Sequence, residues 1–125
     1  MKIYLGVKYY PDNSNKNLID TLSSHLEKQG HQVSCVVRDI EHWGDKVFAV
    51  DELMRKTFEM IDNSDAVLIE LTEKGVGLGI EAGYAFSKGI PITVVAKLGS
   101  DISSTIKGIS KSVISYSDIK EIAVV

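Results

Sequence analysis

The segment of this sequence with the clearest capacity for chemistry is rich in glycine and contains a glutamate. Residues 72–83 read Thr-Glu-Lys-Gly-Val-Gly-Leu-Gly-Ile-Glu-Ala-Gly, with Gly75, Gly77 and Gly79 at alternate positions and Glu81 two residues further on. Glycines let a backbone approach a ligand closely and adopt dihedral angles barred to other residues. Amide groups near a helix N-terminus also favour an anion or a polarised oxygen. The loop could therefore present Glu81 as a nucleophile or general base, but these local features alone favour the alternative that Glu81 only complements the helix dipole.

The same glycines partly match the dinucleotide-binding pattern, in the form Gly77-x-Gly79-x-x-Ala82. That pattern normally follows the first strand of a domain, whereas here it follows the third apparent strand. Glu81 would also place a negative charge where a pyrophosphate binds. The match is therefore weak evidence for a dinucleotide site, and we expect no cofactor.

The elements that must position this segment alternate along the chain, which is typical of βαβ units around a parallel sheet. Strands are expected at residues 2–7, 32–37, 66–71, 91–96 and 112–115. Helices are expected after the turn at residues 11–14, over residues 51–63, 80–88 and 103–107, and at the closing residues 117–122. The prediction is one α/β domain over residues 1–125, a doubly wound five-stranded parallel sheet of flavodoxin-like order in a three-layer sandwich.

In such sheets, ligands bind beyond the carboxyl ends of the strands. The segments 8–12, 38–45 and 72–81 should therefore line one crevice. Residues 38–50 show no clean period and are expected to form a mobile loop. Within that loop, Trp43 either stacks on a ligand or packs at the edge of the sheet.

Composition sets further limits. The 125 residues carry a net charge of −3, which disfavours a broad surface for a nucleic-acid polymer. No segment is long and apolar enough for a signal peptide or a membrane span, so we expect a cytoplasmic protein without a membrane partner. The lone Cys35 is expected to be a buried thiol, and His25 and His31 have no metal-ligand partners at usable spacing. His42 and Asp45 could be ligands or acid-base groups, but a solvated loop histidine is the favoured interpretation.

Residues 76–89, Val-Gly-Leu-Gly-Ile-Glu-Ala-Gly-Tyr-Ala-Phe-Ser-Lys-Gly, resemble the active-site segment of the nucleoside 2-deoxyribosyltransferase family, a superfamily that includes the 2′-deoxynucleoside 5′-phosphate N-hydrolases. The resemblance covers most of the chain. Residues 1–6 are similar to the family's opening strand, residues 63–68 to the strand before the active-site loop, and residues 103–114 to a segment that reaches into a neighbouring subunit.

The resemblance implies a two-step chemistry. Glu81 would attack the anomeric carbon of a deoxyribose and displace the base, and a second base or water would then resolve the glycosyl-enzyme ester. Tyr4 would orient Glu81, although a buried strand tyrosine explains that residue equally well. The substrate would be a deoxynucleoside or its 5′-monophosphate. Its contacts are expected from a set of residues spread over three segments: Gly6, Tyr9, Tyr10, Gly75, Gly77, Gly79 and Ser103.

The sequence departs from the family at two positions. Thr57 stands where the transferases carry a helical aspartate, and Gly75 where they carry an aspartate and the hydrolases a serine. Glu73 or Asp62 could substitute. These departures leave a second hypothesis open, a non-catalytic relative that binds a nucleotide or another small molecule. A flavin-binding protein of flavodoxin type is a poorer third. Because the family completes its sites across subunits, a homodimer or larger even oligomer is expected.

Overall fold

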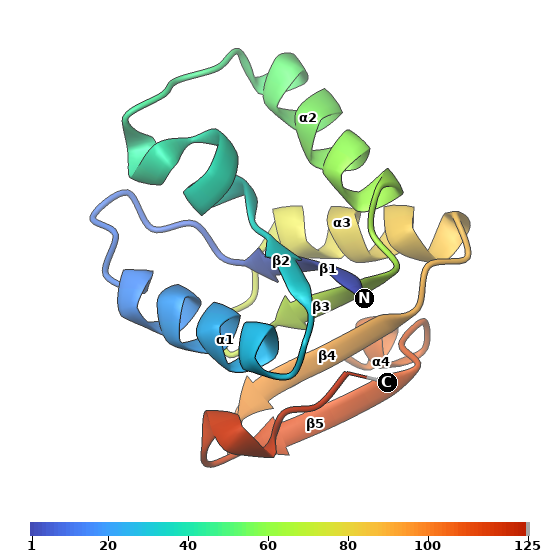
Figure 1. Cartoon of the computed structure of the whole chain (residues 1–125). Helices are drawn as coiled ribbons and strands as arrows, with labels where there is room; N and C mark the ends of the chain where they lie inside the picture. The colour runs from blue at the N-terminus through green and yellow to red at the C-terminus, as the bar shows by residue number, and fades with distance from the viewer. Residues whose placement is uncertain (125) are drawn as a thin grey trace.

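The computed structural model describes residues 1–124 and contains one sheet of five parallel strands (Figure 1). The strands are β1 (Lys2–Val7), β2 (Gln32–Ser34), β3 (Ala66–Glu70), β4 (Ile92–Lys97) and β5 (Ser112–Tyr116). Their order is β2-β1-β3-β4-β5, and every neighbouring pair is parallel. The predicted flavodoxin-like order is confirmed, and it places the switch in strand order between β1 and β3.

Helices cover both faces of this sheet. Helix α1 (Lys16–Lys28) lies on one face, and α2 (Val50–Asp62) and α3 (Val76–Ser87) lie on the other (Figure 1). Because side chains alternate along a strand, Ile3 and Leu5 of β1 join the core on the α1 face, whereas Tyr4 joins the core that contains α3. The short α4 (Ser104–Lys107) adds Ile106 to that second core. Within residues 1–124, no helix has the length and apolar character needed to cross a membrane.

The second strand is shorter than predicted. It ends at Ser34, and residues Val36–Ile40 form a π-helical turn instead of continuing the strand. Polar side chains hold this turn: the Asp39 carboxylate accepts a hydrogen bond from the Cys35 amide at 2.9 Å, and Arg38 donates to the Val33 carbonyl at 2.7 Å. The apolar run 33–37 predicted a strand, but these bonds divert the backbone away from the sheet.

The expected loop over residues 38–50 is also partly helical. A 3₁₀ turn, His42–Gly44, follows the π-helical turn, and all three of its residues have positive φ angles of 46°, 60° and 95°. Trp43 is half-buried and packs against the core on the α1 face, with the Lys16 ammonium 5.0 Å from its ring centroid. Of the two alternatives for Trp43, the structure therefore shows packing.

Helix α3 begins four residues earlier than predicted, at Val76 instead of Ile80. Gly77 and Gly79 belong to its first turns, and the extended Gly75 is its N-cap. None of these three glycines has a positive φ, so the expectation that they adopt dihedral angles barred to other residues is wrong. Glycine disfavours a helix interior, but burial of Leu78 on the sheet outweighs that preference.

The predicted closing helix is reduced to a 3₁₀ turn, Ile119–Glu121, preceded by a capping box of Asp118 and Glu121. Its neighbours Ile122 and Val124 are buried against α1 and β1. The remaining elements agree with the prediction to within one or two residues at each end. Gly30 follows α1 with a φ of 95°, as expected for a glycine that ends a helix.

Candidate active site

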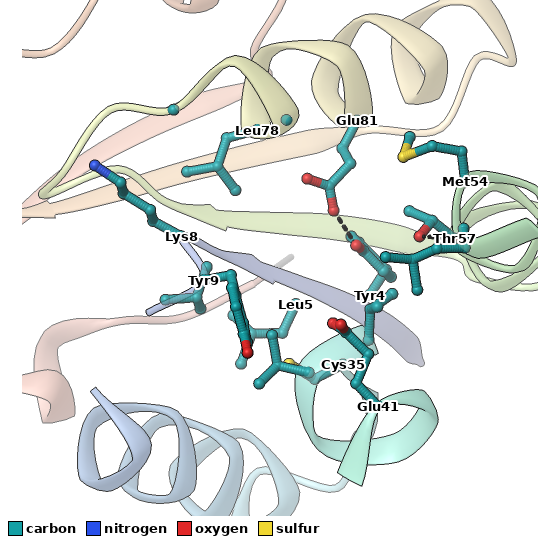
Figure 2. A pocket seen from close by; sticks show the side chains of 16 residues that line it. Tyr4, Leu5, Lys8, Tyr9, Cys35, Glu41, Met54, Thr57, Leu78 and Glu81 are labelled. Atoms are coloured by element: carbon teal, nitrogen blue, oxygen red, sulfur yellow. Dashed lines mark hydrogen bonds between the residues drawn. The ribbon is translucent and has the colours of Figure 1, made fainter. Parts of the chain in front are cut away.

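A cleft of about 270 Å³ opens at the carboxyl end of β1, between α2, α3 and the connection from β2 to α2 (Figure 2). Its walls are mostly apolar, which is typical of a small-molecule site. The predicted crevice is therefore present, and each of the three expected segments contributes to it. The lining residues from those segments are Lys8, Tyr9, Glu41, Gly75, Gly77, Leu78 and Glu81.

Tyr4 and Glu81 meet in this cleft, although they lie 77 positions apart in the sequence. The Tyr4 hydroxyl donates a hydrogen bond to Oε1 of Glu81 (Figure 2). The Tyr4 side chain is only 1% exposed, so its position is fixed by the core of the sheet. Glu81 is half-buried and turns its carboxylate toward the open part of the cleft.

Gly6 lies where β1 meets side chains from β3 and α3. A Cβ atom at Gly6 would lie 2.8 Å from Cδ1 of Ile69 and 3.5 Å from Cδ2 of Leu78. The missing side chain therefore leaves room for Ile69 of the neighbouring strand, and Leu78, in the first turn of α3, packs beside it. Glu81 lies three residues after Leu78, at the border of the buried helix face, so seating Leu78 brings the carboxylate to Tyr4. Gly6 itself does not line the cleft.

The environment of Glu81 alters its acidity. Burial raises the pKa of Glu81 from 4.5 to about 7, and the hydrogen bond from Tyr4 acts in the opposite direction. Burial, followed by the nearby Glu81 charge, raises the pKa of Tyr4 well above its usual value. The shared proton therefore stays on the tyrosine, and Glu81 accepts it as a hydrogen bond. At neutral pH a large share of Glu81 is ionised and able to act as a nucleophile or base.

Some of the other predicted site residues line the cleft, and the rest lie outside it. Tyr9, Gly75 and Gly77 line the cleft with Tyr4 and Glu81. Tyr10 faces a separate depression beside Thr72 and Lys97, on the other side of Lys8. Gly79 and Ser103 lie together in a third hollow, an apolar groove beside α4, which we call the α3–α4 groove. The structure thus brings together five of the nine predicted residues.

Neither proposed substitute for the missing family carboxylates lies in the cleft. Asp62 accepts hydrogen bonds from the Tyr84 hydroxyl at 2.8 and 2.9 Å, and Glu73 is exposed, 3.9 Å from the Lys8 ammonium. Thr57 does line the cleft, but its hydroxyl donates to the Leu53 carbonyl within α2.

One lining residue was missed in the sequence. Glu41 lies between the two helical turns of the β2–α2 connection and carries its carboxylate into the cleft (Figure 2). Burial raises the pKa of Glu41 above its usual range. It belongs to no motif, and the segment around it has no period, so only its place after the second strand could have drawn attention to it.

No potential metal site accompanies these carboxylates. Over the described residues 1–124, no three histidine, cysteine, aspartate or glutamate side chains lie close enough together to hold a metal ion. The thiol of Cys35 lines the cleft, but it is 2% exposed and burial raises its pKa to about 11.

The raised pKa of Glu81 predicts a pH-dependent effect of Glu81→Gln on stability. Since the folded protein binds this proton more tightly than the unfolded chain, the stabilisation is complete below about pH 4.5 and is lost as the pH rises through about 7. Glutamine stays neutral and avoids that loss. We expect Glu81→Gln to raise Tm by roughly 2–6 °C at pH 8 and by much less at pH 5, measured by thermal unfolding.

An exposed carboxylate supplies the control for that comparison. Glu59→Gln changes a carboxylate on the outer side of α2 and should alter Tm equally at the two pH values. An equal shift at both pH values for Glu81→Gln would contradict the assigned burial of its charge.

Comparison with known proteins places this cleft in context. No family model matches the chain. The "Putative 2'-deoxynucleoside 5'-phosphate N-hydrolase 1" of Thermofilum pendens is 29% identical, over 97% of this chain and 89% of that protein. The solved 2-deoxyribosyltransferase of Bacillus psychrosaccharolyticus has a TM-score of 0.77 at 18% identity, over 97% of this chain and 89% of that one. The CMP N-glycosidase of Clostridium botulinum has a TM-score of 0.71 at 20% identity, over 97% and 93% of the two chains.

These two structures share the fold, and the first protein shares sequence over nearly the whole chain. These findings confirm the resemblance to the nucleoside 2-deoxyribosyltransferase family that was found in the sequence.

Proposed function

We propose that this protein cleaves or transfers the N-glycosidic bond of a 2′-deoxynucleoside or its 5′-monophosphate. The observation that carries the proposal is the hydrogen bond from buried Tyr4 to Glu81 in an apolar cleft. The relatives are named as an N-hydrolase, a deoxyribosyltransferase and an N-glycosidase, and these names favour an enzyme over the non-catalytic alternative. The proposal treats residues 1–125 as one domain of this type, located in the cytoplasm.

In the proposed reaction, Glu81 is the nucleophile. One carboxylate oxygen bonds to the anomeric carbon as the bond from that carbon to the base breaks, which leaves a glycosyl-enzyme ester. Tyr4 holds the other oxygen and thereby sets the direction of attack. Water or a second base then attacks the same carbon and releases Glu81. The transition state carries positive charge on the sugar, which the Glu81 charge stabilises in an apolar site.

The remaining predicted residues take subordinate roles. Tyr9, Gly75 and Gly77 would contact the substrate directly, since they line the cleft. Glycine at position 77 leaves the approach to the carboxylate open, because an added Cβ would lie 3.9 Å from Oε2 of Glu81. Gly6 would act indirectly, by leaving room for the Ile69 side chain between β1 and β3. Ser103 would reach a neighbouring subunit's substrate.

Turnover with two variants tests the two assigned roles. Glu81→Gln should abolish release of free base, because an amide cannot form the ester. Tyr4→Phe should lower kcat/KM by about 10- to 100-fold at neutral pH. It should also move the acidic limb of the pH profile to higher pH, because the hydrogen bond from Tyr4 lowers the pKa of Glu81 and its loss raises that pKa. Chromatography of deoxynucleosides and their 5′-monophosphates, with and without an acceptor base, measures both.

Asp62→Asn is the matched control, because Asp62 lies outside the cleft and accepts hydrogen bonds from Tyr84. It should retain wild-type turnover. Folded wild-type protein that releases no base from any of these donors would remove the proposal and return the binding alternative to first place. Base release that survives in Glu81→Gln would assign the chemistry to another residue.

We also propose that the protein forms a homodimer through the exposed face of α3. Three large apolar side chains on α3 are exposed: Val76 by 83%, Ile80 by 47% and Phe86 by 57%. Val76 also lines the α3–α4 groove, which holds Gly79 and Ser103. An apolar surface of this kind is typical of a protein interface.

We expect a dimer by light scattering at micromolar concentration, and a monomer after Ile80→Glu, because the substitution places a charge on the proposed interface. Val47→Glu changes another exposed apolar side chain, 90% exposed and far along the chain from α3, and should leave the dimer intact. A monomeric wild-type protein would contradict this part of the proposal.

A further inference from the structure

Glu41 is the second carboxylate of the cleft, and it comes from a different wall. Glu81 comes from α3, whereas Glu41 comes from the β2–α2 connection, on the other side of Tyr4 (Figure 2). A ligand in the cleft would therefore lie against both carboxylates.

The backbone of Glu41 is held firmly. Its amide donates to the Val36 carbonyl at 3.0 Å and closes the π-helical turn. Its carbonyl accepts hydrogen bonds from the amides of Gly44 and Lys46, both at 3.0 Å. The three residues that follow it have left-handed backbones, two of them without glycine's freedom, and such strain is found at functional sites.

The side chain of Glu41, in contrast, is without a partner. In the part of the chain that the structure describes, its carboxyl group makes no hydrogen bond and no ion pair. Burial in the cleft raises its pKa, which means that a larger share carries a proton than on an exposed glutamate. A backbone this well anchored, with a carboxyl group that faces the open cleft, is suited to a ligand that bonds to that carboxyl group.

The proposed reaction needs a proton donor beside the nucleobase. The nucleobase leaves with the electrons of the glycosidic bond, and it is a poor leaving group until it is protonated. The other titratable groups of the cleft are less suited to donate it. The Tyr4 hydroxyl is bonded to Glu81, the Cys35 thiol holds its proton to about pH 11, and Lys8 extends to the mouth, toward Glu73 and the Tyr10 ring. Tyr9 is 40% exposed, and its hydroxyl lies close to Gly44.

We propose that Glu41 is the proton donor to the departing base, an inference that rests on the proposed function. As an oxygen of Glu81 bonds to the anomeric carbon, the bond between that carbon and the base breaks, and its electron pair passes to the base. The Glu41 carboxyl group gives its proton to a ring nitrogen or oxygen of the base, which leaves neutral. In the second step, the Glu41 carboxylate takes a proton from the attacking water or acceptor base, and Glu81 is released.

A pair of donors with different leaving groups tests this role. 2′-Deoxyguanosine needs a proton to release guanine, whereas 7-methyl-2′-deoxyguanosine already carries a positive charge and releases a neutral base without one. Each is used as the nucleoside and as the 5′-monophosphate. We expect Glu41→Gln to lower kcat by about 10²- to 10⁴-fold with the unmethylated donor and by less than about threefold with the methylated one.

Two further variants make the result specific. Asp45→Asn exchanges an exposed carboxylate in the same connection and should retain wild-type kcat with both donors. Glu81→Gln should lose activity with both donors, because the nucleophile is needed in either case. A Tm of Glu41→Gln that is no lower than that of the wild-type protein verifies its folding, since glutamine also avoids burial of a charge.

Equal losses with both donors in Glu41→Gln would overturn the inference and assign Glu41 to binding of the base. No loss with either donor would overturn it as well. Failure of the proposed function has a different signature, since the wild-type protein would then release base from neither donor.

Discussion

The site depends on one unfavourable arrangement, a carboxylate held in an apolar cleft with a single hydrogen bond. Glu81 loses much of its hydration there, and Tyr4 replaces only part of it. Packing of the surrounding fold must therefore hold α3 in the position that places Glu81 in this cleft. Burial of the α3 side chains Leu78, Ala82 and Ala85 on the sheet does so, because it fixes the helix face that borders Glu81. This packing thus stabilises an arrangement that the carboxylate alone would oppose.

The rest of the cleft is organised around that pair. The β1–α1 loop supplies Tyr9 and Lys8, and the β2–α2 connection supplies Glu41 from the other side. That connection is the least regular part of the chain, yet backbone hydrogen bonds and the packed Trp43 hold it in place. A flavodoxin-like sheet provides the place where these loops meet, whereas the chemistry comes from the loops themselves.

Much of the fold could be predicted because alternation of apolar runs and helical periods is a local property of the sequence. The five strands, their order and the crevice follow from it. The early end of β2 could not be predicted, since bonds of Arg38 and Asp39 to backbone groups compete with an apolar run that is otherwise typical of a strand. The start of α3 was missed because two glycines argue against a helix, and only packing of Leu78 reverses that preference.

The candidate site was predictable in part. The glycine-rich surroundings drew attention to Glu81, but its role and its pairing with Tyr4 were predicted from family resemblance, because no local pattern links residues 77 positions apart. The resemblance also suggested Gly6 and Tyr10 as direct contacts, but the structure places them outside the cleft. No sequence pattern marked Glu41 as a site residue. Its candidate role follows from the cavity into which its side chain points.

The most direct test of the central claim is to trap the covalent intermediate. A donor with fluorine at C2′ destabilises the positively charged transition states and slows breakdown of the ester, so that the glycosyl-enzyme accumulates. Intact-mass measurement followed by peptide mapping then locates the sugar. The account predicts one sugar per chain, on the peptide that contains Glu81. A sugar on another residue, or release of base with no covalent adduct at any time, would contradict it.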